Sequence, residues 1–449
     1  AIDTSNNEEI NFDTSATYRI TIDSNLKVEE VTDAGLYYSN SNSETIYPCD
    51  KTSTCVSSIT STDDGGYITT IVLGMLSDSE KYLIDANATA SNEQIDLNIP
   101  TVDDFVGLIL KYNSNGKIEN YQTIKSDGTG KNTGIKIEIS NLKKAHDGGY
   151  IITGSERYDA FYFAAEDTVV GKEIKAAQPY KGGSSTGDSY PFIIKLNENL
   201  KVEWIDCLEG GNTADYGQVY DDFIVEDNGD IIVVGEIGKK ARTISSTNTV
   251  DENDIEIVES DDNYRGVIVK YRNDGKIEWV RTPRCIYEET RNGETYVEKS
   301  ALSMGYYGIE KNKNGDYIIV SDYPSKNRTN SIMKVDIEDT ENNKLIKFKT
   351  SSSYKFSMII QFTNEGKIKN IRVLNNAEIR GTADGRMSTT LKLGENIYYA
   401  SDKKLYKYQL DVAQAAEKAE IEVENNRKEY KITTDVEEFD GIKGGSISG

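Results

Sequence analysis

The residues best suited to binding chemistry are aromatic. Tyr158, Phe161, Tyr162 and Phe163 fall within six positions of one another in an otherwise polar stretch. Aromatic side chains give a large contact area at a low entropic cost, and they stack on sugar rings and on protein surfaces. We therefore take these four as candidate ligand-binding residues, with the alternative that they pack against the chain's own core. Three further tyrosines from neighbouring loops join the candidates: Tyr216, Tyr287 and Tyr296.

Catalytic and metal chemistry has little support in the sequence. The one histidine, His146, precedes a hairpin turn, and no nucleophile elbow, phosphate-binding loop or zinc-protease motif is present. The stretch Asp227-Asn228-Gly229-Asp230 lacks the later acidic ligand of a calcium loop, so turn chemistry explains it better. The acidic segment 251–263 could hold calcium through oxygen ligands, although such a run is more often solvated. We assign no catalytic residue, metal site or cofactor, and keep calcium as the alternative.

The four cysteines suggest an oxidising compartment. Cys49 and Cys55 are separated by five residues in a polar loop, which predicts a small disulfide loop. Cys207 and Cys285 each follow an equivalent strand in successive repeats, so a second bridge between them is the further prediction. An even number of cysteines with one close pair favours an extracellular setting. The alternative is that these residues are reduced thiols.

Composition limits the class of partner. The 449 residues carry 75 acidic and 51 basic side chains, for a net charge of −24. Nucleic acids and anionic membranes are bound mainly through Lys and Arg, so neither is expected as a partner. No apolar run approaches 18 residues, so no membrane insertion is expected. The chain begins at Ala1, which indicates a processed or excised piece.

An internal repeat determines the predicted fold. A turn motif of the type Asp-Gly-Gly-Tyr or Asn-Gly-Asp recurs with its first glycine at positions 65, 148, 229 and 315. Each copy precedes an apolar run, which is the pattern of a β-hairpin whose glycine supplies a positive φ. A second motif alternates with it, as in FVGLILKYNSNGKIENYQTI and RGVIVKYRNDGKIEWVRT. Each repeat of roughly 80 residues thus holds four strands, A to D, with an insert between B and C.

Four strands per tandem repeat predict an all-β fold, a β-propeller of four-stranded blades. The chain opens with a C–D pair (16–22 and 26–31) and closes with an A–B pair (about 386–402). These two halves can share one blade and close the ring, which hides two sheet edges. That count favours five blades. Residues 404–410 look like another C strand, so six blades are the alternative, and a β-sandwich array or a solenoid is the alternative to any propeller.

The alternation of these motifs resembles the propeller repeats of bacterial secreted and cell-surface proteins, which are similar in blade plan to quinoprotein-like and WD40-like propellers. The resemblance covers about residues 15–410 and implies an extracellular fold rather than an activity. Trp204 and Trp279 occupy equivalent positions where other repeats carry Asn120, Asn370 and Glu30. Quinoproteins repeat a tryptophan in every blade, so no quinone cofactor is expected.

Three segments are predicted: a propeller over 1–410, a linker or short helix over 411–428, and the start of a following β module over 429–449. The last segment resembles the opening of repeat modules in clostridial-type surface proteins. Within the propeller the B–C inserts at 75–104, 156–190, 236–265 and 322–357 are long, whereas the A–B and C–D turns are tight. The added sequence should therefore gather on one face, and long loops in compact domains are usually functional.

These features predict a non-enzymatic binding or adhesion module, secreted or on a bacterial cell surface, whose loop-built face receives a glycan or protein ligand. We expect it to act as a monomer within a longer multi-domain protein. The alternatives are a carbohydrate-active propeller enzyme that uses paired carboxylates at the central axis, and a structural spacer of a larger surface protein.

Overall fold

The computed structural model describes most of the repeats in detail. The described stretches are residues 55–73, 80–97, 106–126, 136–157, 161–176, 189–208, 218–238, 242–257, 264–302, 305–322, 332–349 and 356–375, together with short strands between 2 and 48 and between 391 and 448. Within them the chain forms strands and short 3-10 turns and contains no α-helix. No helix in this part of the chain is long and apolar enough to cross a membrane.

Four antiparallel sheets of the predicted A–B–C–D order form the body of the molecule. Sheet 1 contains β7 (Cys55–Ser61), β8 (Tyr67–Leu73), β11 (Val106–Tyr112) and β12 (Ile118–Ser126). Sheet 2 contains β13 (Lys136–Lys144), β14 (Tyr150–Arg157), β17 (Ser189–Leu196) and β18 (Val202–Cys207). Sheet 3 contains β19 (Val219–Val225), β20 (Ile231–Gly238), β23 (Tyr264–Tyr271) and β24 (Ile277–Arg281). Sheet 4 contains β27 (Tyr306–Lys311), β28 (Tyr317–Asp322), β31 (Phe356–Phe362) and β32 (Ile368–Asn375).

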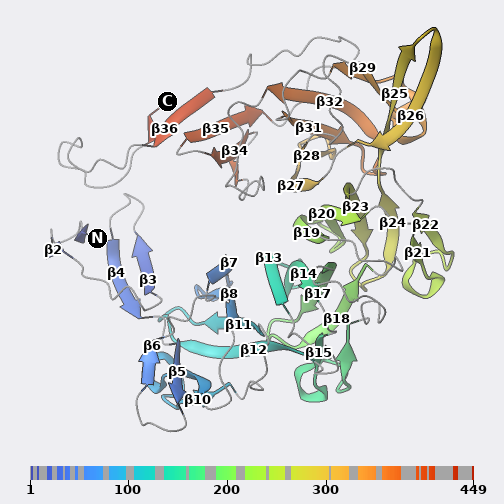
Figure 1. The fold of residues 1–449 in the computed structure, drawn as a ribbon. Coiled ribbons are helices and arrows are strands. Elements are labelled where there is room, and N and C mark those ends of the chain that lie inside the picture. The colour runs from blue at the N-terminus through green and yellow to red at the C-terminus, as the bar shows by residue number, and fades with distance from the viewer. Residues whose placement is uncertain are drawn as a thin grey trace.

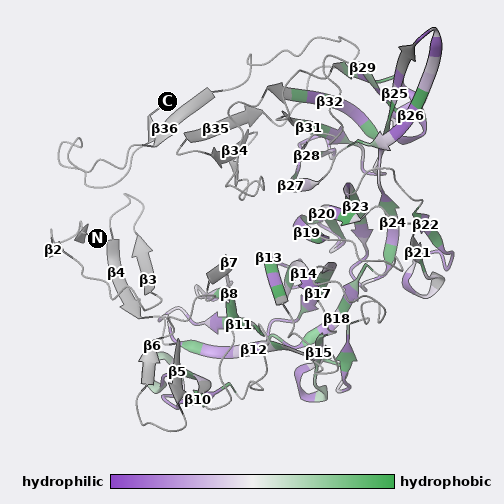
Figure 2. Ribbon diagram, viewed as in Figure 1, coloured by the Kyte–Doolittle hydropathy of each residue, from purple (hydrophilic) through white to green (hydrophobic). Residues whose placement is uncertain are grey.

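The sheets follow one another along an arc, with their A strands on the inner side and their D strands on the outer side (Figure 1). The hydrophobic core lies between neighbouring sheets, and both faces of each inner sheet are buried. In sheet 2, Ile152 and Ile194 pack with residues of sheet 1, whereas Ile151 and Ile193 pack with residues of sheet 3. Because side chains alternate along a strand, adjacent residues serve opposite interfaces. This explains why the B and C strands are largely apolar in sequence, and Figure 2 shows hydrophobic residues in all four sheets.

A β-bulge in each A strand joins neighbouring sheets on the inner side of the arc. Every A strand shifts register at the same place, between Val56 and Ser58 in β7 and between Tyr220 and Asp222 in β19, for example. The residue after the bulge contacts the next A strand: Ser58 Oγ accepts a hydrogen bond from the Leu142 backbone N–H at 3.2 Å. In sheets 1 to 3 the residue after the bulge is Ser58, Asn141 or Asp222, so these bulges place polar side chains between adjacent A strands, whereas Gly308 occupies this position in sheet 4.

Among these bulge residues, Asp222 accepts the most hydrogen bonds. Its Oδ1 accepts hydrogen bonds from Asn141 Nδ2 at 2.6 Å, Lys143 Nζ at 2.6 Å and the Phe223 N–H at 2.8 Å. Its Oδ2 accepts the Ile309 N–H at 3.1 Å. One buried carboxylate thus connects the A strands of sheets 2, 3 and 4.

The sequence predicted that the inserts stay at the B–C end of the sheets, and the structure shows a different path. Each runs along the outer D strand to the opposite end, where a threonine forms a parallel bridge with the first residue of that strand. The four bridges are Thr89–Ile118, Thr168–Val202, Thr249–Ile277 and Thr340–Ile368. In sheets 1 to 3 the N–H of the residue after this threonine donates to the carbonyl of the first D-strand residue, so the insert satisfies a backbone group at the outer edge of the sheet that would stay unpaired. The extra sequence is therefore spread over the rim.

Short strands from the inserts and from two long D–A loops form outer sheets at this rim (Figure 1). One sheet contains β6 (Ile46–Pro48), β5 (Leu36–Asn40), β9 (Glu80–Ile84) and β10 (Ile95–Asp96). β15 (Phe161–Phe163) and β16 (Ile174–Lys175) extend sheet 1, and β21 (Arg242–Ile244) pairs with β22 (Ile255–Ile257). β25 (Arg284–Arg291), β26 (Glu294–Ala301), β29 (Ile332–Val335) and β30 (Lys347–Lys349) form another sheet.

The terminal strands form separate sheets at the two ends of the arc. β1 (Ile2–Asp3) pairs with β2 (Glu8–Glu9), and β3 (Tyr18–Ile22) pairs with β4 (Val28–Asp33). At the other end β33 (Leu391–Leu393), β34 (Asn396–Ser401), β35 (Lys404–Gln409), β36 (Lys428–Ile432) and β37 (Ile447–Ser448) form one sheet in that order.

The predicted closure is not found among the described strands. β3 pairs with β4 alone, and the partners of β34 are β33 and β35 rather than β3. The segment 404–410, which looked like a C strand, forms β35 and pairs with β34. The edge of β34 that β3 was predicted to occupy is therefore taken by β35. Most of the predicted linker at 411–428 lies outside the described residues.

Candidate functional site

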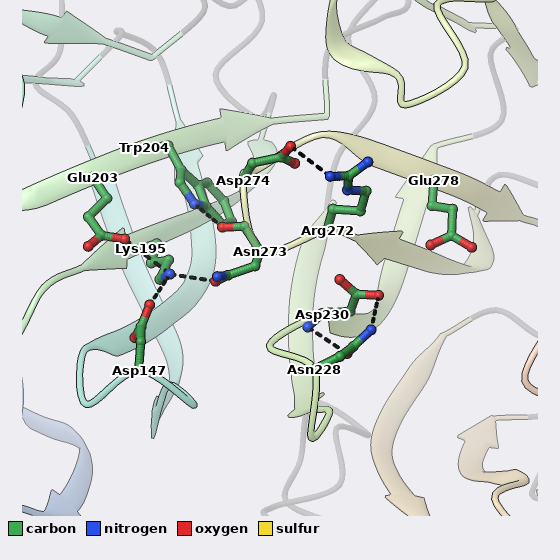
Figure 3. Close-up of a pocket in the computed structure, with 10 residues that line it drawn as sticks. All are labelled: Asp147, Lys195, Glu203, Trp204, Asn228, Asp230, Arg272, Asn273, Asp274 and Glu278. Carbon is green, nitrogen blue, oxygen red and sulfur yellow. Dashed lines mark hydrogen bonds and ion pairs between the residues drawn. The ribbon is translucent and has the colours of Figure 1, made fainter.

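A polar cleft opens between sheets 2 and 3, at the end of the sheets that carries the tight A–B and C–D turns. Its volume is about 620 Å³. The lining residues come from turns and strands of both sheets: Asp147, Lys195, Glu203, Trp204, Asn228, Asp230, Arg272, Asn273, Asp274 and Glu278 (Figure 3). All of them except Trp204 are charged or are amides.

Lys195 forms the centre of one wall. It extends from β17, and its side chain is only 3% exposed. Its ammonium group lies 2.5 Å from Asp147 Oδ2 in the A–B turn and 3.0 Å from Glu203 Oε2 in β18. It also donates to Asn273 Oδ1, in the C–D turn of sheet 3, at 2.5 Å (Figure 3). Burial raises the pKa of Asp147, but the hydrogen bonds from Lys195 and from the Gly149 N–H, together with the charge of Lys195, outweigh burial and hold that pKa below its ordinary value.

Lys270 occupies the same place in sheet 3. Its Nζ lies 3.0 Å from Glu278 Oε2 and 3.5 Å from Asp230 Oδ2. Burial lowers the pKa of Lys270, but the hydrogen bond and charge of Glu278, together with the charges of Asp230 and Glu226, outweigh burial and raise that pKa above its usual value. Sheet 1 repeats the arrangement, since Lys111 lies 3.0 Å from Glu119 and interacts with the charge of Asp64. Each unit consists of one lysine from strand C and two carboxylates, one from the A–B turn and one from strand D.

Sheet 4 exchanges the charges of this unit. Gln361 replaces the lysine of strand C, and Lys369 replaces the glutamate of strand D. Asp316 remains, and it lies 3.0 Å from Lys369 Nζ and accepts from Gln361 Nε2 at 2.7 Å. Both positions differ from those of sheets 1 to 3. The turn carboxylate of sheet 4 therefore still has a lysine partner, but the carboxylate of strand D is missing. Sheets 1 to 3 thus carry one more negative charge per unit than sheet 4.

Trp204 joins the two sheets at the edge of the cleft. Its indole N–H donates to the Asn273 backbone carbonyl at 2.9 Å, and its ring covers Gly275 in the C–D turn of sheet 3. Gly275 has φ +84°, and a Cβ there would lie 2.7 Å from the ring. Trp279 covers Gly366 of sheet 4 in the same way. The two tryptophans therefore hold neighbouring sheets together, and Trp204 also lines the cleft.

The chemistry of the cleft is that of an anionic binding surface. Five carboxylates and two cations line it. Lys195 is buried and shared between two carboxylates, and Arg272 lies 3.4 Å from Asp274. A carboxylate has about four acceptor positions, so these oxygens can accept further donors. No cluster of three or more histidine, cysteine or acidic side chains suited to a metal ion occurs among the described residues.

The predicted aromatic candidates do not line this cleft. Phe161 and Phe163 are fully buried, and the Phe161 ring lies 5.2 Å from that of Phe192 in an edge-to-face contact. These two belong to the core, which is the packing alternative, because they alternate with Tyr162 along β15. Tyr162 is partly buried, and the Lys175 ammonium lies over its ring.

The other tyrosines are dispersed. Tyr287 is buried in the core between sheets 3 and 4, whereas Tyr296 is 53% exposed on β26. Tyr158 and Tyr216 lie outside the described residues. The five candidates that the structure describes therefore do not form one exposed surface.

The bridge predicted between Cys207 and Cys285 is absent. Both side chains are buried thiols, and they lie in different parts of the core. Cys207 Sγ lies 3.7 Å from Glu156 Oε1, and Cys285 Sγ donates to the Ala301 carbonyl at 3.4 Å. The strand end carrying Cys207 faces sheet 1, while β25 carries Cys285 beside β29. Cys49 lies outside the described residues, so its pairing with Cys55 stays a prediction.

No family model matches the sequence, and no curated protein matches it. A protein of unknown function from Bacteroides caccae is similar at 10% identity and a TM-score of 0.30, over 83% of this chain and 82% of that one. The extracellular domain of a one-component system from B. thetaiotaomicron is 11% identical at a TM-score of 0.20, over 88% of this chain and 51% of that one. The tricorn protease is 10% identical at a TM-score of 0.25, over 89% and 38%. At such TM-scores these likenesses identify neither a fold family nor a function.

Proposed function

We propose that this chain is an extracellular or bacterial cell-surface binding module, and that its ligand places a cationic group in the cleft between sheets 2 and 3. The observation that carries the proposal is the excess of carboxylates around a cleft whose one buried cation is already shared. A lysine or arginine side chain of a partner protein has the donors that such oxygens accept. The location outside the cell rests on the repeat resemblance, since the second disulfide that would have supported it is absent.

The affinity of the cleft for a cation would come from its negative charge and from an aromatic ring beside it. Each of the two lysine-centred units at the cleft contributes two carboxylates for one lysine, so the cleft carries a net negative charge. The half-buried ring of Trp204 adds an aromatic face, which attracts a cation through its quadrupole. The long-range field of a chain with a net charge of −24 would also steer a basic partner toward it.

A substitution at the rim of the cleft tests the proposal. Asp274 is about half exposed, and Asp274→Asn keeps its shape while removing its charge. We expect the affinity for a hexalysine peptide, measured by calorimetry, to fall about fivefold, and to fall further as salt is added. The matched control is Glu365→Gln, which removes a carboxylate at the equivalent turn position of sheet 4, outside the cleft.

A glycan array with the same protein covers the other ligand class. Strong binding of a neutral glycan, unchanged by Asp274→Asn, would place the ligand elsewhere and contradict the assignment of the cleft. The proposed module is non-enzymatic, in line with the bulge carboxylate Asp222, whose two oxygens are occupied by four donors. Glycosidase activity that depended on a pair of inner-strand carboxylates would instead support the enzyme alternative.

We also propose that sheets 1 to 4 are blades of a closed propeller of five blades, with six as the alternative, and that residues 1–410 form it. The support is the shared strand order and the interface that each sheet makes with the next. In this proposal β3 and β4 complete the ring, so deletion of residues 1–35 should lower the melting temperature by about 5 °C or more. A truncated chain that melts like the intact one would contradict closure.

A further inference from the structure

We propose that β26 is a self-association edge, through which two copies of this chain pair as antiparallel strands. The β25–β26 hairpin projects from the outer rim beside sheets 3 and 4 (Figure 1). Among the strands that the structure describes, β26 pairs only with β25, so its other edge is open. The proposal is independent of the cleft and replaces the expectation of a monomer.

The outer half of β26 stands clear of the body of the protein. Residues 294 to 297 are exposed on both faces of the strand, and Tyr296 and Val297 are 53% and 62% exposed. A strand packed on a core buries every second side chain, so this segment has no core beneath it. An exposed edge that carries β-favouring residues is a template for another strand.

The turn geometry fixes which backbone groups face outward. Asn292 and Gly293 both have positive φ, +52° and +85°, which is the type I′ geometry of a two-residue hairpin. In such a turn the Glu294 N–H donates back to the Arg291 carbonyl. Because bonded and non-bonded pairs alternate along an antiparallel ladder, the N–H and C=O groups of Thr295, Val297 and Lys299 point to the open edge.

Charge and the number of paired residues together select one register for two copies. When Val297 faces Val297 of the second copy, Tyr296 faces Glu298 and Thr295 faces Lys299, so no like charges are opposed. Moving the two-fold axis to residue 296 opposes Glu294 with Glu298, and moving it to 298 opposes Glu298 with itself. An axis at 299 opposes two copies of Lys299. Like charges directly opposite destabilise a strand pair. An axis at 295 would pair only residues 294 to 296 of β26, and residues 300 and 301 are buried, so the axis at Val297 is favoured.

Sedimentation velocity of the full chain over a range of concentrations gives the first test. We expect a concentration-dependent dimer that strengthens as salt is raised, because screening reduces the repulsion between two strongly acidic copies. A wild-type chain that stays monomeric up to several hundred micromolar overturns the proposal.

Substitutions at the two-fold axis give the second test. Val297→Lys and Val297→Glu each place like charges opposite one another, so each variant alone should dimerise about tenfold more weakly than the wild type. Mixed together, the two variants should recover a heterodimer, because Lys then faces Glu. Val170→Lys is the matched control, since Val170 is 60% exposed but lies away from β26. A dimer that Val297→Lys leaves intact, or a mixture that shows no recovery, overturns the proposed register.

Discussion

Replacing Phe161 with alanine is expected to lower the free energy of unfolding by about 3–5 kcal/mol. The side chain is fully buried, and it packs against Phe163 and Phe192 in the core between sheets 1 and 2. Removing it leaves a cavity that the surrounding strands can fill only in part, because interiors are close-packed. Chemical denaturation followed by fluorescence or circular dichroism measures the loss.

The adjacent Tyr162 gives the control for this substitution. It points to the other side of β15, where the Lys175 ammonium lies 5.9 Å from the centre of its ring. Tyr162→Ala should therefore cost no more than about 1 kcal/mol. Equal losses for both variants would contradict the orientation of β15, and a stable Phe161→Ala variant would return that residue to the candidate ligand surface.

Replacing Asp222 with alanine is the second large effect, with an expected loss of about 3 kcal/mol. The substitution leaves the Ile309 N–H, the Phe223 N–H and the Asn141 amide without their acceptor. It also removes the carboxylate that neutralises Lys143, although that ammonium is 34% exposed and can be rehydrated, which limits its share. Buried donors without acceptors account for most of the loss.

Asp227→Ala is the matched control for Asp222, since Asp227 is an exposed acid in the turn that follows the same strand. Its removal should change the stability by less than about 0.5 kcal/mol. Asp222→Asn should fall between the two, because an amide oxygen still accepts one or two of the hydrogen bonds. A loss below about 1 kcal/mol for Asp222→Ala would mean that the A strands are held together without this carboxylate.

The strand order of the sheets could be predicted because two local signals coincide in each repeat. Glycine-containing turns mark the hairpins, and apolar runs mark the buried B and C strands. The path of the inserts could not be predicted, since it depends on a single threonine bridge to the D strand in each repeat. The pairing of β34 with β35 could not be predicted either, because the sequence of an edge strand does not specify which neighbouring strand it pairs with.

The candidate aromatic residues show where pattern alone was insufficient. The sequence Phe161-Tyr162-Phe163 alternates as a strand does, and that alternation could have indicated that the phenylalanines share a buried face. The lysine units of the cleft do have a sequence signal, which is a fixed spacing between two charged residues. A charged residue in strand C and another eight positions later recur as Lys111 and Glu119 and as Lys195 and Glu203. Only the structure shows that a turn carboxylate completes each unit.

Hydrogen–deuterium exchange of the full chain with and without hexalysine tests the cleft as the ligand site most directly. If the peptide binds there, added protection should appear in the turns at 145–149, 226–230 and 272–276, which surround the cleft, and the equivalent turns of sheet 4 should be unchanged. Protection confined to the rim inserts, or no protection at peptide concentrations that saturate binding, would contradict the assignment of the cleft.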